Sequence, residues 1–317
     1  MEKEYIVNLD LPASERWAFL KNHAAEIDEL IECYLSDLAG ETSIFDIIGL
    51  YKQQLIPTSY LEEIDFIASI SKYSADQILI ANLYYDVLKF YFGCTAFAFN
   101  NADTVVHARN LDWHTENNLL STHSKIFNFQ RGGKTVYKTV GWAGFVGALS
   151  GTKPGKFSVT LNAVLSNDSP EVAMPISFLL RDVLDSAESF NEAKRQLEAT
   201  IIVSDCLLLL SGVNVGEMAV IERTPSRFAT RVPESGKGYI VVTNDYKKLQ
   251  NNETDDSILQ STSCGRFDRA TLLLSSEQDL SFRECIQVLS DENIKMGITV
   301  QQMVFNNRTG EVALIKT

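Results

Sequence analysis

Residues 94–112 read CTAFAFNNADTVVHARNLD, and this stretch decides the fold of the chain. Its alternating first part predicts a strand, the polar NNAD predicts a turn, and the next five residues predict the returning strand. Because a hairpin brings its two ends together, we expect Cys94 to share a site with Arg109 and Asp112. A guanidinium beside a thiol stabilises the thiolate. The stretch therefore predicts a reactive cysteine at the end of a hairpin.

The thiol needs a base, and the histidines do not supply one in the usual pattern. The chain has four histidines, His23, His107, His114 and His123, and none lies after position 123. A Cys-His protease usually has its catalytic histidine well downstream of the cysteine. Their spacing fits no common set of zinc ligands, so we expect packed or solvated histidines and no metal. No Gly-x-Ser-x-Gly elbow is present either.

The remaining base is the α-amino group of Cys94 itself. An unperturbed α-amino group has a pKa of about 7.7–8.0, so it takes up a proton near neutral pH. This chemistry requires a cut between Gly93 and Cys94. The sequence thus indicates a cysteine that becomes an N-terminus, and it indicates no organic cofactor.

Five blocks of sequence carry a family resemblance. Gly93-Cys94-Thr95 with HARNLD at 107–112 resembles the start of the catalytic subunit in the acid ceramidase and N-acylethanolamine acid amidase family. That family belongs to the N-terminal nucleophile (Ntn) hydrolases, together with the choloylglycine (bile salt) hydrolases. Four further blocks agree in order and approximate spacing, at 7–17, 141–162, 243–246 and 266–270.

The resemblance implies roles for five residues. Cys94 would be the nucleophile, with Arg109 against it. Asp112 would accept a hydrogen bond from the freed α-amine, and Asn244 would form the oxyanion hole. Arg269 would support the new N-terminus; we prefer it to Arg266 because the following Ala-Thr-Leu continues the family's helix better.

The substrate pocket is less well defined. The family carries Asn-Glu where this chain has Asn162 and Ala163, so one polar group of the site is replaced. Asn162 is still a candidate for the pocket. Trp142 and Phe145 are candidates for an acyl channel, and core packing is the competing interpretation for both.

Composition narrows the function classes. The chain has 317 residues, 45% of them hydrophobic, and a formal net charge of −13. The negative charge argues against nucleic acid as a partner. No stretch resembles a secretory h-region or a spanning helix. The five cysteines are scattered without a Cys-x-x-Cys, which suits a reducing compartment, so we expect a cytoplasmic protein.

Periodicity and capping signals predict the element order. We expect helices at 14–39, 59–70 and 75–90; strands at 94–100, 104–109, 125–131, 134–141, 144–150 and 157–164; helices at 175–184 and 189–199; strands at 206–212, 217–222, 228–232 and 239–243; helices from 266 and from 281; and strands at 298–305 and 311–315.

This order predicts an α+β protein with two stacked antiparallel sheets covered by helices, the αββα layout of the family. Residues 1–93 would form a mainly helical α-subunit or pro-segment. Residues 94–317 would form the catalytic β-subunit. The two parts are expected to stay associated after cleavage.

The function expected from these features is that of a self-processing cysteine amidase, a zymogen, which hydrolyses the N-acyl bond of a lipid amide similar to a ceramide or an N-acylethanolamine. This function is compatible with transient contact between the protein and a membrane surface. An acylase on another amide (a bile salt, a penicillin, an N-acyl amino acid or a homoserine lactone) and an acyltransferase are alternatives. An inactive lipid-binding homologue is a further one, to which the change at Ala163 gives some weight.

Overall fold

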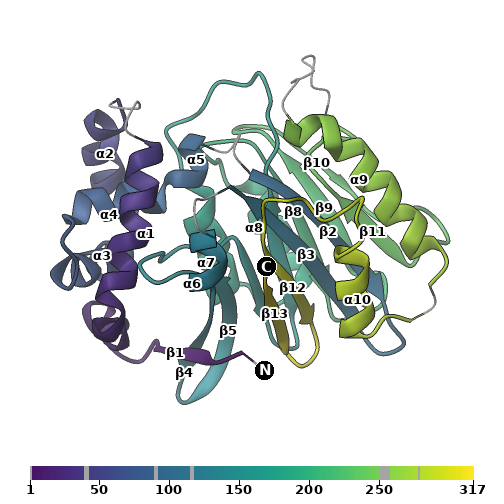
Figure 1. Cartoon of the computed structure of the whole chain (residues 1–317), viewed down its shortest axis with the longest axis horizontal. Helices are drawn as coiled ribbons and strands as arrows, with labels where there is room; N and C mark the ends of the chain where they lie inside the picture. The colour runs from purple at the N-terminus through teal and green to yellow at the C-terminus, as the bar shows by residue number, and fades with distance from the viewer. Residues whose placement is uncertain (1, 39–42, 89–91, 115–117, 250–257, 278) are drawn as a thin grey trace.

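The structure, a computed structural model, describes residues 2–38, 43–88, 92–114, 118–249, 258–277 and 279–317 (Figure 1). Two stacked β-sheets form its centre, and helices cover the outer face of each sheet. This layout confirms the predicted α+β sandwich.

The larger sheet has eight strands in the order β1-β4-β5-β6-β7-β8-β9-β10. Neighbouring strands run antiparallel except for β1 and β4, which are parallel. The strands are β1 (Glu4–Asn8), β4 (Lys125–Arg131), β5 (Lys134–Gly141), β6 (Ser150–Lys153), β7 (Phe157–Asn162), β8 (Cys206–Gly212), β9 (Met218–Arg223) and β10 (Phe228–Arg231).

The smaller sheet has five antiparallel strands in the order β11-β2-β3-β12-β13. The strands are β2 (Phe92–Asn100), β3 (Val105–Trp113), β11 (Tyr239–Val242), β12 (Thr299–Asn306) and β13 (Val312–Lys316). The predicted hairpin of β2 and β3 forms its centre, so the candidate cysteine lies on a strand with neighbours on both sides.

Helices cover both sheets. Helices α9 (Ile258–Ser275) and α10 (Phe282–Leu289) pack on the smaller sheet, and α7 (Ile176–Ser186) and α8 (Phe190–Ala199) pack on the larger one (Figure 1). The remaining helices are α1 (Ala24–Asp37), α2 (Ser43–Gln54), α3 (Thr58–Ser69), α4 (Ala75–Asn82), α5 (Tyr84–Leu88), α6 (Leu119–His123) and two short 3-10 helices, Ala13–Glu15 and Ala18–His23.

Alternating side chains divide the core into layers, because successive residues of a strand point to opposite faces. In β8, Leu208 and Leu210 pack toward the helical side, while Leu207 and Leu209 pack between the two sheets. In β2, Ala96 lies between the sheets and Phe97 faces α9 and α10. Small alanines of β2 and larger leucines of β8 therefore share the interior between the sheets.

The N-terminal helices and the rest of the molecule share one core. Strand β1 joins the larger sheet, and residues of α1, α3 and α4 belong to the same apolar cluster as Trp142 and Leu161. At the centre of this contact, Glu63 receives two hydrogen bonds from Arg181, of 2.5 and 2.8 Å, and one of 2.7 Å from the indole of Trp17. All three side chains are buried.

The predicted element order was wrong in places. Residues 144–149 do not form a strand, because their backbone groups are bound elsewhere: Asn82 accepts from Val146 N and donates to Gly144 O, and Arg181 donates to Val146 O. Helix α2 was not predicted. The capping boxes at Ser74 and Ser281 are confirmed.

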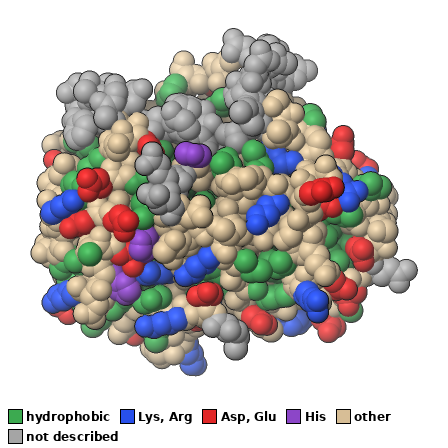
Figure 2. All heavy atoms as spheres, in the orientation of Figure 1, with side chains coloured by type: hydrophobic (Ala, Val, Ile, Leu, Met, Phe, Trp, Pro, Cys, Tyr) green, Lys and Arg blue, Asp and Glu red, His purple; other side chains and the backbone are tan. Residues whose placement is uncertain are grey.

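Acidic, basic and hydrophobic side chains are interspersed over the face of the molecule shown in Figure 2. Among the described helices, none has the length and apolar character needed to cross a membrane.

Candidate active site

The register of the central hairpin determines which side chains meet. Gly93 is paired with Asp112, Cys94 with Leu111, and Ala96 with Arg109. Cross-strand partners project from the same face of a sheet, so Cys94 and Arg109 both face the larger sheet. Asp112 projects from the opposite face. The hairpin thus brings the predicted guanidinium to the thiol and holds the carboxylate opposite Gly93.

The sulfur of Cys94 is buried and has two polar neighbours. Arg109 Nη2 donates to Sγ at 3.0 Å, and Sγ lies 3.8 Å from the carbonyl oxygen of Leu161. The same guanidinium donates to Leu161 O at 2.6 Å, Leu149 O at 3.0 Å and Ser150 Oγ at 2.5 Å. Arg109 is therefore fixed by the larger sheet, with its guanidinium held against the sulfur of Cys94.

The backbone of Cys94 is held by Asn244, which follows β11. Cys94 N donates to Asn244 Oδ1 at 3.1 Å. Asn244 Nδ2 donates to Ala163 O at 2.8 Å, and Asn244 N donates to Ser263 Oγ at 2.9 Å. A side-chain amide has two N–H donors, and one hydrogen bond from Asn244 Nδ2 is found within the described residues.

The structure corrects the choice between the two arginines of α9. Arg266 donates from Nη1 to Cys94 O at 2.6 Å and from Nη2 to Asn244 Oδ1 at 2.7 Å. Arg269 instead pairs with Asp291 at 2.6 Å, on the outer side of the helix. Buried Ser263, Arg266 and Ala270 lie on one face of α9, and Arg269 lies off it. Arg266 therefore takes the position that was predicted for Arg269.

Asp112 is fully buried and makes one hydrogen bond within the described residues, from Thr299 Oγ1 to Oδ1 at 2.5 Å. Its Oδ2 has no partner. Burial raises the pKa of Asp112, although Thr299, Arg266 and Arg109 oppose that rise. A register shift between Thr299 and Gln301 in β12 accompanies this contact. A buried carboxylate oxygen is thus free next to the strand position of Gly93.

The predicted pocket residues lie around this centre. Asn162 Nδ2 donates to Val242 O at 3.2 Å and Thr243 O at 2.9 Å, which ties β7 to the segment that carries Asn244. Trp142 is buried, and its indole N–H donates to Leu120 O. Phe145 packs edge-on against Trp142 with ring centroids 6.2 Å apart. Both aromatic residues pack with the apolar cluster that includes Cys94; their part in an acyl channel stays a prediction.

His107 is packed between the sheets. Its Nδ1 lies 2.8 Å from Ser211 Oγ and its Nε2 lies 2.8 Å from Thr160 Oγ1. Burial, helped by the nearby charge of Arg109, lowers the pKa of His107 to about 3. The described residues contain no group of three or more His, Cys, Asp or Glu side chains that could hold a metal.

Two residues at the site were missed from the sequence. Ser263 donates to Thr243 Oγ1 at 2.8 Å as well as accepting from Asn244 N. Its spacing of three from Arg266 on one helix is a signal that could have found it. Thr299 has no such signal, because its contact with Asp112 depends on the strand order and on the irregular register of β12.

Comparisons with known proteins identify the family of the chain. A family model described as acyl-coenzyme A:6-aminopenicillanic acid acyl-transferase matches residues 99–309. The chain is 30% identical to the acid ceramidase of Balaenoptera acutorostrata scammoni over 97% of this chain and 84% of that protein. It is 27% identical to the acid ceramidase of Homo sapiens, with the same coverage of 97% and 84%.

A solved structure, the Caenorhabditis elegans N-acylethanolamine-hydrolyzing acid amidase (NAAA) ortholog, is similar with a TM-score of 0.57 and 26% sequence identity. The match covers 68% of this chain and 93% of that chain. The acyl-transferase model covers more than half of the chain, and the acid ceramidases match nearly all of it. The chain therefore belongs to the family of that model and to the acid ceramidase and N-acylethanolamine acid amidase family of Ntn hydrolases.

Proposed function

We propose that the protein is a self-processing cysteine amidase that hydrolyses the N-acyl bond of a lipid amide through a thioester on Cys94. The observation that carries the proposal is the 3.0 Å contact between Arg109 Nη2 and Cys94 Sγ, with the amide of the same cysteine held on Asn244. Reactive cysteines lie beside cations such as arginine, whereas structural buried cysteines are inert.

Self-cleavage is the first step of the proposal. Cys94 Sγ attacks the carbonyl carbon of Gly93, the new C–S bond replaces the C–N bond, and the departing nitrogen takes a proton. Water then hydrolyses the thioester, which gives a carboxylate on Gly93 and a free α-amine on Cys94. Asn244 Oδ1 and Arg266 hold the two sides of Cys94 during this exchange, and Oδ2 of Asp112 is open to bind the new ammonium.

The catalytic cycle uses the same atoms on a substrate. The α-amine accepts the thiol proton as Sγ attacks the acyl carbonyl, and it returns a proton to the departing amine. A side-chain N–H of Asn244 stabilises the oxyanion, a type of contact whose loss costs about 2.7–4 kcal/mol of barrier in subtilisin. Because Cys94 is fully buried in the intact chain, cleavage at position 93 would also open the site to substrate.

Residues 1–93 and 94–317 would remain associated as α- and β-parts. The buried Glu63–Arg181 pair, the shared apolar cluster and the β1–β4 pairing all join the two parts. Asn82 of the α-part also binds Gly144 and Val146 of the β-part. None of these contacts depends on the Gly93–Cys94 bond.

The substrate class comes from the relatives, which include acid ceramidases and a structure described as N-acylethanolamine-hydrolyzing. We therefore infer an acyl chain on an amide nitrogen, and capture of the substrate at a lipid surface. Ala163 replaces the polar side chain that the family resemblance leads one to expect, so the amine part is expected to differ from those of the relatives.

A mass spectrum of the purified chain tests self-cleavage. The expected result is two fragments that end at Gly93 and begin at Cys94, with only full-length chain for Cys94→Ala. Cys264→Ala, which changes an exposed cysteine, is the matched control and should cleave as the wild type does. Full-length wild-type chain after incubation at acidic and neutral pH would contradict the proposal.

A panel of N-acyl substrates then tests the reaction. Release of fatty acid from an N-acylethanolamine or a ceramide by the wild type, and not by Cys94→Ala, is expected. Turnover of bile salt, penicillin or homoserine lactone amides alone would identify another acylase. Lipid binding without turnover, by a chain that does not cleave, would identify an inactive homologue.

Acyl transfer is a second candidate, favoured by the description of the matching family model. Hydrolase and transferase share the thioester on Cys94 and differ in whether water or an amine attacks it. Product analysis with and without an added primary amine separates them: a new N-acyl product formed at the expense of the free acid indicates transfer.

A further inference from the structure

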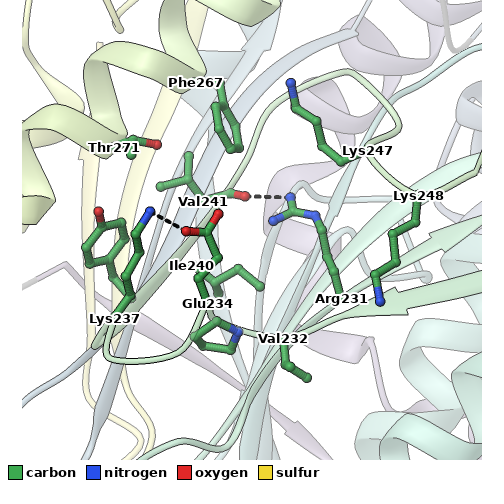
Figure 3. A pocket seen from close by; sticks show the side chains of 12 residues that line it. Arg231, Val232, Glu234, Lys237, Ile240, Val241, Lys247, Lys248, Phe267 and Thr271 are labelled. Carbon is green, nitrogen blue, oxygen red and sulfur yellow. Dashed lines mark hydrogen bonds and ion pairs between the residues drawn. The ribbon is translucent and has the colours of Figure 1, made fainter.

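A cationic pocket lies on the side of the molecule where β10, β11 and α9 meet (Figure 3). It has a volume of about 430 Å³, a size suited to a small organic ligand. Its lining includes Arg231, Lys237, Lys247, Lys248 and the ring of Phe267. In a chain with a formal net charge of −13, four cations and one carboxylate, that of Glu234, line this cavity, so its local charge is positive.

A buried carboxylate, that of Glu222, anchors the segment that carries two of the lining lysines. Glu222 Oε2 accepts the backbone N–H groups of Lys248 and Leu249, at 2.8 Å each, and Oε1 accepts that of Lys247 at 2.9 Å. Residues 247–249 are thus held to Glu222 through their backbone N–H groups. The side chains of Lys247 and Lys248 line the pocket, and in the view of Figure 3 their ammonium groups lie on either side of the Arg231 guanidinium.

Lys247 and Lys248 have no ion-pair partner in the part of the chain that the structure describes, whereas Lys237 pairs with Glu234 at 2.7 Å. Lys248 Nζ donates to Thr230 O at 2.8 Å, and Lys247 Nζ lies 4.5 Å from the centre of the Phe267 ring. Among the described residues, two ammonium groups are therefore open to an anion.

Arg231 supplies a third cation at the base of the pocket. Its Nη2 donates to Val241 O at 2.5 Å, and its Nε forms an ion pair with Glu222 Oε1 at 3.5 Å, although this buried Nε has no hydrogen-bond partner among the described residues. Burial lowers the pKa of Arg231 to about 10. Glu222 opposes this fall in pKa, and an anion in the pocket would oppose it further, since an opposite charge favours the charged form.

The apolar part of the lining limits the choice of anion. The ring of Phe267 and the side chains of Val232 and Pro233 border the same cavity, and Val232 is 62% exposed. Three cations suit a phosphate group better than a single carboxylate, because a phosphate monoester carries more charge and more acceptor oxygens. The apolar border suits a ring or short chain attached to it.

We propose that this pocket binds a phosphate monoester that carries an apolar group, with the phosphate among Lys247, Lys248 and Arg231 and the apolar group against Phe267 and Val232. The ligand is either a free organic phosphate or the headgroup of a lipid. This site is separate from Cys94 and does not depend on the proposed amidase reaction.

Phenyl phosphate is the probe, and calorimetric titration of the full chain is the measurement. Saturable binding to one site is expected, tighter than that of inorganic phosphate, and weaker as the salt concentration rises. The double variant Lys247→Gln/Lys248→Gln should lose at least tenfold in affinity. Val232→Glu adds a negative charge at the exposed border of the pocket, which repels the phosphate, and should lower the affinity by a similar factor.

The matched control is Lys21→Gln/Lys295→Gln, which removes the same charge from two exposed lysines outside the pocket. It should bind phenyl phosphate as the wild type does. Phosphatidylcholine vesicles with and without phosphatidic acid test the lipid source by co-sedimentation. Binding only to phosphatidic acid vesicles, lost in the pocket variants and kept in the control, supports a lipid headgroup. Absence of saturable binding to every probe, or an equal loss in the control, would overturn the proposal.

Discussion

The guanidinium of Arg266 lies 2.6 Å from the carbonyl oxygen of Cys94, measured from Nη1, while its Nη2 reaches the oxygen of Asn244 that also accepts the amide of Cys94. Arg266 thus fixes both the nucleophile's backbone and its candidate oxyanion residue. A buried, forked contact of this kind is specific to arginine, because the single ammonium of lysine cannot reproduce its geometry.

The first prediction is that Arg266→Lys slows self-cleavage by at least about tenfold, since a hydrogen bond to a charged group contributes about 1.5–3 kcal/mol. Arg269→Lys, on the same helix, should cleave within about twofold of the wild type, because an exposed ion pair contributes only about 0–1 kcal/mol. Time courses by mass spectrometry measure both variants, with circular dichroism to verify folding. A larger defect in Arg269→Lys than in Arg266→Lys would reverse the assignment.

The second prediction concerns Thr299, whose hydroxyl donates to Asp112 at 2.5 Å. This hydrogen bond lowers the pKa of a carboxyl that burial raises. Thr299→Val removes the lowering contribution, so the pKa of Asp112 should rise further. If self-cleavage or amide hydrolysis needs the ionised carboxylate, the acidic limb of the pH–rate profile moves to higher pH.

The rate at the alkaline plateau should change less than the rate on the acidic limb in Thr299→Val. This distinguishes a positioning role on Asp112 from a general loss of stability, which would lower the rate at every pH. Thr122→Val, an exposed change of the same size, is the control and should leave the profile in place. An unshifted acidic limb in Thr299→Val would show that Asp112 does not act through this hydroxyl.

The sequence was sufficient for features that depend on local pattern. The alternation of residues 95–99 and the turn after them predicted the β2–β3 hairpin, and the hairpin alone brings Arg109 to Cys94. Capping boxes located α4 and α10 for the same reason, since the groups that form them are three residues apart.

Features that depend on how elements far apart in the sequence pack together could not be predicted from local sequence pattern. Which face of α9 meets β2 decides between Arg266 and Arg269, and the family pattern in this block did not resolve it. The strand expected at 144–150 is absent because Asn82 and Arg181, both far away in the sequence, bind the backbone there. The parallel pairing of β1 with β4 likewise joins the first strand to one more than a hundred residues later.

The third prediction concerns pH and His107, which links the two sheets through Thr160 and Ser211. Its pKa falls from 6.5 to about 3 on folding, so the unfolded chain binds a proton that the folded chain does not. The stabilisation is fully present above the unfolded value and is lost as the pH falls from about 6.5 toward 3. At pH 5 the loss from this group is about 2 kcal/mol of the free energy of unfolding.

His107→Gln keeps a polar side chain between the sheets and removes the titration. Denaturation of the intact Cys94→Ala chain at pH 7.5 and pH 5 measures the effect. The drop in stability between the two pH values should be smaller by about 2 kcal/mol in the His107→Gln background. His114→Gln, which changes an exposed histidine, is the control and should keep the full drop. Equal drops in all three chains would mean that His107 does not cause the acid sensitivity.

The fourth prediction concerns the association of residues 1–93 with residues 94–317 after cleavage. Glu63 and Arg181 form a fully buried bidentate pair across the two parts, and Trp17 donates to the same carboxylate. Glu63→Gln leaves the charge of Arg181 buried without its counter-charge, which costs about 3–5 kcal/mol. We expect the cleaved variant to separate into two fragments on dilution, whereas the cleaved wild type stays together.

Glu2→Gln is the matched control, because Glu2 and Lys316 also form an ion pair between the two parts, 3.8 Å apart, but at the surface. An exposed pair contributes at most about 1 kcal/mol, so this variant should stay associated. Native mass spectrometry of the cleaved proteins over a dilution series measures the fraction of intact complex. If Glu63→Gln and Glu2→Gln dissociate at the same concentration, the apolar cluster and the β1–β4 pairing alone hold the parts, because the buried pair then adds nothing to the association.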